Sequence, residues 1–191
     1  MKIAITLGLF SLLITACIIT KTNGFYIGYK ELTNIERKDV VFVSPDSNIC
    51  NLKQNYKIYA ITGSQLKNCL TKQDTSIVYL WGPNCSSEHC ILISACEDYC
   101  IKRKYKLFVV ANYYDMQQMH AQNESIFPML IANHIYYSKR YANALNTLFI
   151  KDLLSNNKIS KDVQYKRFLV FKSDKLIEAK SNLFNSIPAK N

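Results

Sequence analysis

Short apolar runs alternate along the chain with segments of helical periodicity. Four runs have the length and the β-branched and aromatic content of strands: 39–44 (DVVFVS), 56–62 (YKIYAIT), 76–81 (SIVYLW) and 106–111 (KLFVVA). The last two runs lack polar alternation, which is typical of strands that are buried on both faces of a sheet. The pattern therefore predicts an α/β chain with helices on both faces of a central sheet.

Helical patterns lie between and after these runs. Residues 64–72 begin with Ser64 after a glycine, which favours a short helix with a capped N-terminus. Residues 86–105 and 137–154 carry apolar side chains at three- and four-residue spacing. The helix over 86–105 stands between the two fully apolar runs. It therefore predicts a strand–helix–strand unit with a parallel strand pair.

The last third of the chain is expected to complete the sheet. Residues 114–122 have helical spacing and residues 128–131 (PMLI) suit a short extended segment. Residues 167–180 (RFLVFKSDKLIEAK) form two strand-like runs around a turn at residues 173–174, which predicts a hairpin. Since 49% of the residues are apolar and no internal repeat occurs, one domain over 39–191 is expected.

The first seventeen residues (MKIAITLGLFSLLITAC) have the layout of a secretory signal peptide, and the apolar stretch is short for a membrane span. Residues 14–17 (ITAC) resemble the bacterial lipobox. That resemblance implies that residues 1–16 are removed and that Cys17 carries a diacylglyceryl group. An ordinary secretory signal and an uncleaved anchor helix are the alternatives. Residues 17–38 are expected to be a tether from the membrane to the fold.

The net charge of +10 comes from 24 Lys and Arg against 14 Asp and Glu. The densest basic cluster interrupts a predicted helix–strand boundary, without interleaved aromatics, at Lys102, Arg103, Lys104 and Lys106. This placement favours a solvated face, and no nucleic-acid partner is expected. The expected partners are the membrane, through the lipid, and thiol-containing proteins of the bacterial cell envelope.

Six cysteines follow Cys17, an even number that permits disulfides in an exported chain without fixing their pairing: Cys50, Cys69, Cys85, Cys90, Cys96 and Cys100. Cys50 and Cys69 precede the strand–helix–strand unit, in elements that are expected to be adjacent. We predict a structural disulfide between them. Closing a loop of about twenty residues would stabilise the fold by roughly 3 kcal/mol through the entropy of the unfolded chain.

Cys85 follows Trp81 by four residues, at the predicted junction of a buried strand and a helix. Together with the late hairpin, this arrangement resembles the thioredoxin-like fold, most closely the membrane-tethered, extracytoplasmic thioredoxin-like lipoproteins of Bacteroidota. The resemblance covers about residues 56–183. It implies a central mixed sheet flanked by helices, a C-terminal hairpin and thiol–disulfide exchange through Cys85. Two features depart from the family: Glu88 replaces the resolving cysteine, and residues 163–168 lack the cis-proline.

The chemistry of the residues supports a reactive Cys85. A helix N-terminus and His89 at i+4 would stabilise its thiolate, whereas Glu88 would oppose this. The favoured interpretation is a thiol with a pKa below the usual value of about 8.5. Cys90 is the candidate partner, since position 88 has no cysteine. The spacing of Cys85 and Cys90 requires an irregular first helical turn.

Two other interpretations remain open. Cys96 and Cys100 would share one helix face, either as core residues or as ligands of a soft metal ion with Cys85 or His89. Copper-handling members of the thioredoxin-like superfamily pair two cysteines with a distant histidine, for which His120 or His134 are available, although their motif spacing differs. In the second interpretation Cys85 has no catalytic role, and the chain is a non-catalytic envelope lipoprotein that uses the fold as a binding module. The favoured interpretation requires neither a metal nor a cofactor.

Overall fold

The computed structural model describes residues 24–85, 90–122 and 125–184, and seven strands of this part of the chain form one sheet. The strand order is β1-β2-β5-β4-β3-β6-β7. The first five strands in this order run parallel, whereas β6 pairs antiparallel with β3, and β7 with β6. The strands are β1 (Val40–Phe42), β2 (Ile58–Ile61), β3 (Thr75–Trp81), β4 (Lys106–Ala111), β5 (Met129–Ala132), β6 (Phe168–Lys172) and β7 (Lys175–Lys180).

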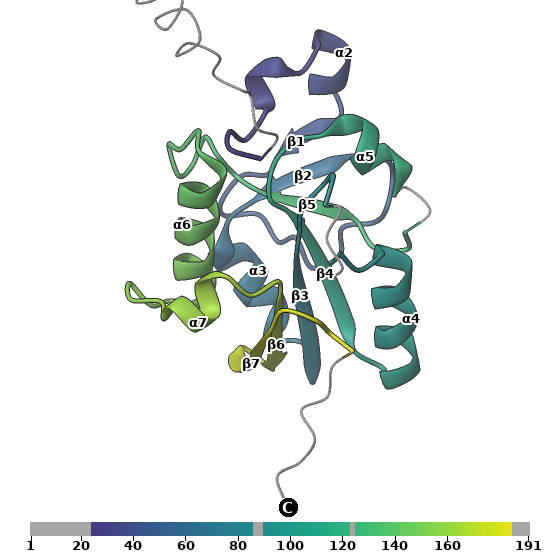
Figure 1. Cartoon of the computed structure of the whole chain (residues 1–191), viewed down its shortest axis with the longest axis vertical. Helices are drawn as coiled ribbons and strands as arrows, with labels where there is room; N and C mark the ends of the chain where they lie inside the picture. The colour runs from purple at the N-terminus through teal and green to yellow at the C-terminus, as the bar shows by residue number, and fades with distance from the viewer. Residues whose placement is uncertain (1–23, 86–89, 123–124, 185–191) are drawn as a thin grey trace, which may run out of the picture.

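Helices cover both faces of this mixed sheet, which confirms the α/β class. Figure 1 shows α3, α6 and α7 on one side of the strands and α4 and α5 on the other. The helical elements are η1 (Tyr29–Glu31), α2 (Asn34–Arg37), α3 (Gly63–Leu70), α4 (Ile93–Arg103), α5 (Met116–Ala121), α6 (Ala142–Leu154) and α7 (Lys161–Gln164).

Each face of the sheet buries its own apolar cluster. Along β3, Ile77 and Tyr79 pack in the cluster that contains α4 and α5 residues, whereas Val78 and Leu80 pack in the cluster that contains α3 and α6 residues. Alternate side chains of one strand point to opposite faces, so a strand covered on both faces is apolar at every position. This accounts for the continuous apolar runs in the sequence.

Helix α3 begins in close contact with α6. Thr62 caps α3: its Oγ1 accepts from the Gln65 backbone N–H at 3.2 Å, and Gln65 Oε1 accepts from the Thr62 N–H at 2.9 Å. A Cβ atom on Gly63 would overlap the backbone of Phe149 and Leu153 in α6. Glycine at this position therefore allows the two helices to approach each other closely.

The helix expected over 86–105 is shorter, since α4 begins only at Ile93. The Cα atoms of Cys85 and Cys90 are 5.7 Å apart. Leu92, directly before α4, is 68% exposed. Residues 86–89 lie outside the described part of the chain.

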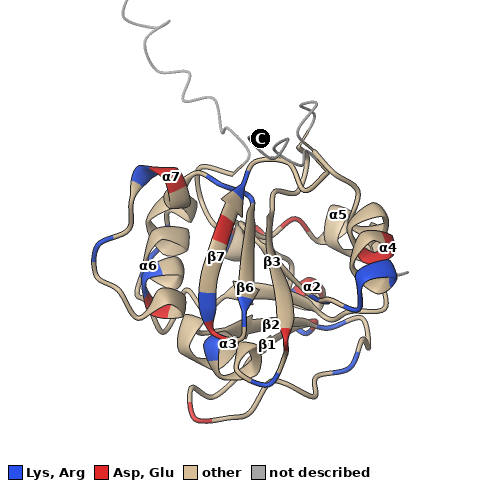
Figure 2. Cartoon of the chain, turned by 90° about the horizontal axis from the view of Figure 1, so that it is seen from below, with Lys and Arg blue, Asp and Glu red and all other residues tan. Residues whose placement is uncertain are grey.

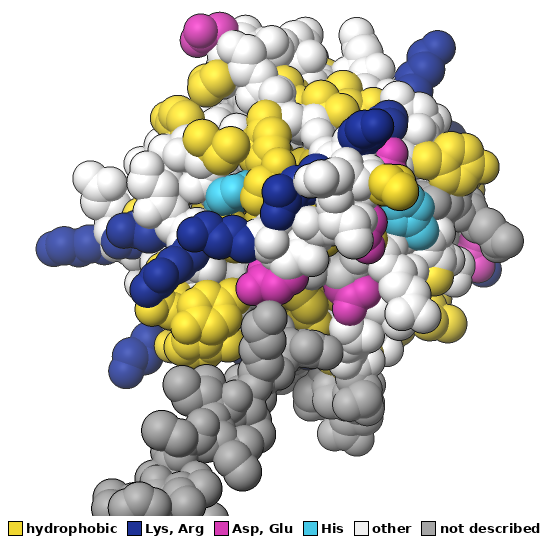
Figure 3. All heavy atoms as spheres, turned by 90° about the horizontal axis from the view of Figure 1, so that it is seen from above, with side chains coloured by type: hydrophobic (Ala, Val, Ile, Leu, Met, Phe, Trp, Pro, Cys, Tyr) yellow, Lys and Arg dark blue, Asp and Glu magenta, His cyan; other side chains and the backbone are white. Residues whose placement is uncertain are grey.

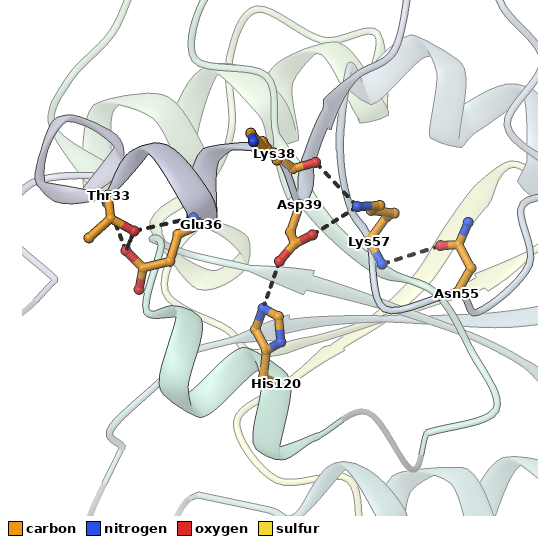
Figure 4. Close-up of polar contacts among 7 residues, drawn as sticks. All are labelled: Thr33, Glu36, Lys38, Asp39, Asn55, Lys57 and His120. Atoms are coloured by element: carbon orange, nitrogen blue, oxygen red, sulfur yellow. Dashed lines mark hydrogen bonds and ion pairs between the residues drawn. The ribbon is translucent and has the colours of Figure 1, made fainter.

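The segment expected as a tether is folded from Gly24 onward. Ile27 and Leu32 are buried. Thr33 and Glu36 form a capping box that begins α2, as Figure 4 shows. The expected signal peptide and Cys17 lie outside the described residues. In the part of the chain that the structure describes, no helix is long and apolar enough to cross a membrane.

The charged side chains are spread over several elements. In Figure 2, Lys and Arg side chains occur on helices, on the β6–β7 pair and on loops, with Asp and Glu among them. The basic residues at the C-terminal end of α4 include Arg103, whose guanidinium lies 3.8 Å from the centre of the Tyr99 ring. This cation is therefore paired with an aromatic side chain of its own helix.

Candidate functional site

Cys85 and Cys90 are joined by a disulfide just beyond the end of β3. The turn before Cys85 contains Asn84 in the left-handed region, with φ of 57°. The side-chain amide of Asn84 donates to the carboxylate of Asp115, the residue that caps α5. The loop that carries Cys85 is therefore attached to the segment that follows β4.

Arg167 reaches the sulfur atoms of both cysteines. Its Nη1 lies 2.8 Å from Cys85 Sγ and 3.6 Å from Cys90 Sγ. The Arg167 carbonyl accepts from the Leu80 N–H at 2.8 Å, and its N–H donates to the Lys180 carbonyl at 3.0 Å. The backbone of Arg167 is thus held between neighbouring strands. The disulfide itself carries no charge, but in the reduced protein a guanidinium at this position would stabilise a thiolate on either sulfur.

The sequence interpretation missed Arg167. Its contact with Cys85 spans 82 positions, beyond the reach of any local spacing rule. One signal was present in the sequence: Arg167 directly precedes the first strand of the predicted hairpin, within the stretch where the thioredoxin-like resemblance places a proline.

Tyr79 forms the buried wall beside this site. Its ring stacks on Phe168 with centroids 4.3 Å apart, and its hydroxyl donates to the Ile91 carbonyl at 2.8 Å. Burial raises the pKa of Tyr79 to about 12, and the neighbouring Cys96 thiol adds to that rise. The hydroxyl therefore stays protonated near neutral pH and holds the chain just after Cys90. Trp81, four residues before Cys85, is buried at the end of β3 as part of the core.

The continuous helix expected over 86–105 is wrong at residues 90–92, which lie outside α4, and α4 begins eight residues after Cys85. The cation that touches the sulfur is Arg167. His89 and Glu88, whose opposing effects on Cys85 were expected, lie outside the described residues.

Cys96 and Cys100 are free thiols on α4, and both are fully buried in the core cluster with Ile93. Burial raises the pKa of each thiol to about 12. Both thiols are therefore neutral near pH 7 and pack as small apolar side chains. Within residues 24–85, 90–122 and 125–184, no group of three or more His, Cys, Asp or Glu side chains is placed to hold a metal ion.

The two described histidines contact other partners. His120 Nε2 lies 3.7 Å from the carboxylate of Asp39, which also pairs with Lys57 Nζ at 2.8 Å. Figure 4 shows the side chains of His120 and Lys57 directed toward Asp39. The His134 ring lies 4.7 Å from the Tyr29 ring, centre to centre. These contacts place both histidines among partners other than the α4 thiols.

Cys50 and Cys69 are also joined, with Cα atoms 5.1 Å apart. Cys69 lies on the buried face of α3, and Cys50 lies in the loop between β1 and β2. The bond therefore ties that loop to the helix, as expected for a structural disulfide. Its residues take no part in the contacts around Arg167.

A polar recess of about 220 Å³ adjoins Arg167. Amide side chains from α6, from α7 and from the segment after β4 line it, including Asn143, Gln164 and Asn112. A recess of this kind suits the polar backbone of an extended peptide, because amide groups both donate and accept hydrogen bonds.

Comparison with known proteins finds no family model, no curated protein and no solved structure that matches this chain.

Proposed function

We propose that this chain is a thiol–disulfide exchange protein in which Cys85 and Cys90 are the redox pair. The observation that carries the proposal is the Arg167 guanidinium, 2.8 Å from Cys85 Sγ and 3.6 Å from Cys90 Sγ. A neighbouring cation stabilises a thiolate, which is the reactive form in exchange. Since Nη1 is closer to Cys85, this sulfur is the favoured nucleophile.

The exchange proceeds in two displacement steps. In the reduced protein the Cys85 thiolate attacks one sulfur of a substrate disulfide, which forms a mixed disulfide and releases the first substrate thiolate. The Cys90 thiolate then attacks Cys85 Sγ, which forms the Cys85–Cys90 bond and releases the second substrate thiolate. Two electrons pass from the cysteine pair to the substrate, and the two thiol protons balance the released thiolates. An external dithiol regenerates the reduced pair by the reverse sequence.

A thioredoxin-like architecture is part of this proposal. It is supported by the parallel pair β3 and β4 joined through α4, and by β6 and β7, which pair antiparallel beside β3. The chain has Glu88 in place of a resolving cysteine and lacks a proline over 163–168. In our proposal Cys90 supplies the resolving thiol, and Arg167 is the residue that contacts the sulfurs from the start of the hairpin.

Serine variants of the two cysteines test the exchange function. Cys85→Ser should abolish the reduction of a small-molecule disulfide, whereas Cys90→Ser should accumulate mixed disulfides on Cys85, detectable by intact mass. Cys96→Ala is the matched control, since Cys96 is buried and free, and it should retain exchange. Equal activity in Cys85→Ser and the unchanged protein would contradict the proposal.

We also propose that the protein is an exported lipoprotein of the bacterial cell envelope, anchored through Cys17. The support is the lipobox-like ITAC at residues 14–17, directly after an apolar segment. Labelling with a radioactive or clickable fatty acid tests this proposal. Cys17→Ser should lose the label and leave an unprocessed precursor, whereas Cys50→Ser should retain it. A label that persists in Cys17→Ser would contradict the anchor.

A non-catalytic binding module is the second candidate. The observation that favours it is the late start of α4 at Ile93, eight residues after Cys85. In that case Cys85 of the reduced protein would be alkylated by iodoacetamide with the pH profile of an ordinary thiol, whose pKa is about 8.5. The exchange function instead requires a Cys85 alkylation rate that reaches half of its plateau below that pH.

A further inference from the structure

A second recess, separate from the sulfur atoms of Cys85 and Cys90, is lined by residues within 26–37, before β1, and by the loop between β5 and α6. Its volume is about 540 Å³, within the usual range of small-molecule sites. Cys85, Cys90 and Arg167 do not line it. The residues that line it are Tyr26, Ile27, Gly28, Tyr29, Lys30, Glu31, Arg37, His134 and Arg140.

Backbone contacts hold the N-terminal wall of this recess in place. The Ile27 N–H donates to the Arg140 carbonyl at 3.0 Å, and the Ile27 carbonyl accepts from the Tyr114 N–H at 2.7 Å. Gly28 has φ of 77°, and a Cβ atom there would lie 2.7 Å from the Tyr114 carbonyl oxygen. The wall is therefore built around a glycine and attached at both sides, so the recess belongs to the fold itself.

The interior of the recess is largely apolar and aromatic. The Tyr29 ring packs against the His134 ring at 4.7 Å and against the Phe42 ring at 5.4 Å. Burial lowers the pKa of His134, so its imidazole is neutral near pH 7. Ile27 contributes a buried aliphatic side chain. These groups favour an apolar ligand body over a strongly hydrated one.

Cations outnumber acids at the same recess. Lys30, Arg37 and Arg140 line it together with a single acid, Glu31. Arg37 is held in position by its Nη2, which donates to the Lys30 carbonyl at 2.9 Å, and its guanidinium lies 5.6 Å from the centre of the Tyr29 ring. In Figure 3, which looks onto this end of the molecule, Lys and Arg side chains lie beside apolar side chains and a histidine.

We propose that this recess binds a small amphiphile with an apolar body and one carboxylate. The apolar body lies against Tyr29, Ile27 and His134, and the carboxylate is paired by the guanidinium groups of Arg37 and Arg140. Guanidinium groups match carboxylates in geometry and lose little hydration on pairing. A neutral or cationic ligand with the same apolar body lacks this pairing. The inference is independent of the exchange function.

Three ligands that share one apolar body test the charge requirement in the full chain: 4-phenylbutyrate, 4-phenylbutanol and 4-phenylbutylammonium. Binding is followed by the imidazole NMR resonances of His134, which report on the recess itself. 4-Phenylbutyrate should shift these resonances saturably, and the other two ligands should bind at least about tenfold more weakly. Equal binding of the three ligands, or His134 resonances that stay unchanged with 4-phenylbutyrate, would overturn the proposal.

Glutamine variants of the arginines test the anion contact. Arg140→Gln keeps the backbone carbonyl that bonds Ile27 and should weaken 4-phenylbutyrate about tenfold, as should Arg37→Gln. Arg103→Gln is the matched control, because Arg103 packs on Tyr99 in α4, outside the recess. If Arg140→Gln and Arg103→Gln bind 4-phenylbutyrate with equal affinity, the guanidinium of Arg140 does not pair with the carboxylate, and this part of the proposal is contradicted. Cys85→Ser should bind 4-phenylbutyrate normally, so failure of the exchange function leaves this test valid.

Discussion

The Nη1 atom of Arg167 lies 2.8 Å from the Sγ atom of Cys85, across 82 positions of sequence. The pairing of two strands makes this contact possible. Tyr79 on β3 is paired with Phe168 on β6, so the start of β6 lies beside the end of β3. Arg167, immediately before β6, is therefore placed near the loop that follows β3, which contains Cys85.

The first prediction is that Arg167→Gln makes Cys85 less reactive. Without the guanidinium, the Cys85 thiolate loses a charged hydrogen-bond donor, so its alkylation rate should reach half of its plateau at a higher pH. At pH 7 the rate should fall by about tenfold. Alkylation of the reduced protein with iodoacetamide between pH 5 and 10, followed by peptide mass spectrometry, measures this for each cysteine.

Two further variants separate charge from packing in this test. Arg167→Lys should restore part of the rate, since an ammonium group also stabilises a thiolate. Lys166→Gln removes a neighbouring positive charge and should change the rate by less than about twofold, as expected for a screened charge in water. If Arg167→Gln and Lys166→Gln have the same pH profile, Arg167 does not act on the sulfur.

The second prediction concerns the Cys50–Cys69 bond. A variant with alanine at both positions should lose about 3 kcal/mol of unfolding free energy, because its unfolded chain is no longer constrained. Urea unfolding measures the loss. Reduction of the Cys85→Ser/Cys90→Ser variant, whose remaining disulfide is Cys50–Cys69, should cause a similar loss. If that protein unfolds at the same urea concentration with and without reductant, the bond contributes no stability.

The third prediction is that Gly63→Ala destabilises the fold by about 3 kcal/mol, since the new methyl group would overlap the backbone of α6. Gly82→Ala is the matched control. The nearest heavy atom to a Cβ at Gly82 is Asn112 Nδ2 at 3.9 Å, so the effect should stay within about 1 kcal/mol. Thermal or urea unfolding of both variants decides the matter. Equal stability of the two would disprove the close α3–α6 packing.

The fourth prediction is a loss of stability at alkaline pH that depends on Cys96. Burial raises the pKa of its thiol in the folded protein from 9.0 to about 12. Between these values the unfolded chain has released a proton that the folded protein retains. The unfolded state thus binds fewer protons, and the unfolding free energy falls as the pH rises. The slope is at most about 1.4 kcal/mol per pH unit for one thiol.

Cys96→Ala isolates this contribution. The variant loses some stability at every pH because a small cavity forms, but its stability should fall less steeply between pH 8 and pH 10. Urea unfolding with both proteins reduced supplies the comparison, because reduction prevents disulfide exchange in the unfolded chains. If the variant and the unchanged protein have parallel pH dependence, the thiol of Cys96 ionises normally in the fold.

The sequence by itself determined the α/β class and most of the elements that form the sheet. Segments such as 76–81 and 106–111 are continuously apolar, and this pattern requires burial on both faces. The sequence likewise predicts a short helix from Ser64, although the structure moves its cap to Thr62 and its first residue to Gly63. These features depend on neighbouring residues, so local periodicity and capping chemistry suffice to predict them.

Tertiary structure decided where α4 begins and which cation meets the sulfurs. The sequence predicts one helix over 86–105, whereas residues 90–92 lie outside any helix and α4 begins at Ile93. The folding of residues 24–38 likewise depends on burying Ile27 and Leu32 against the rest of the fold. Arg167 has no spacing relationship to Cys85 in the sequence. Its position follows from the pairing of β3 with β6, because long-range strand pairing brings side chains together without leaving a local pattern.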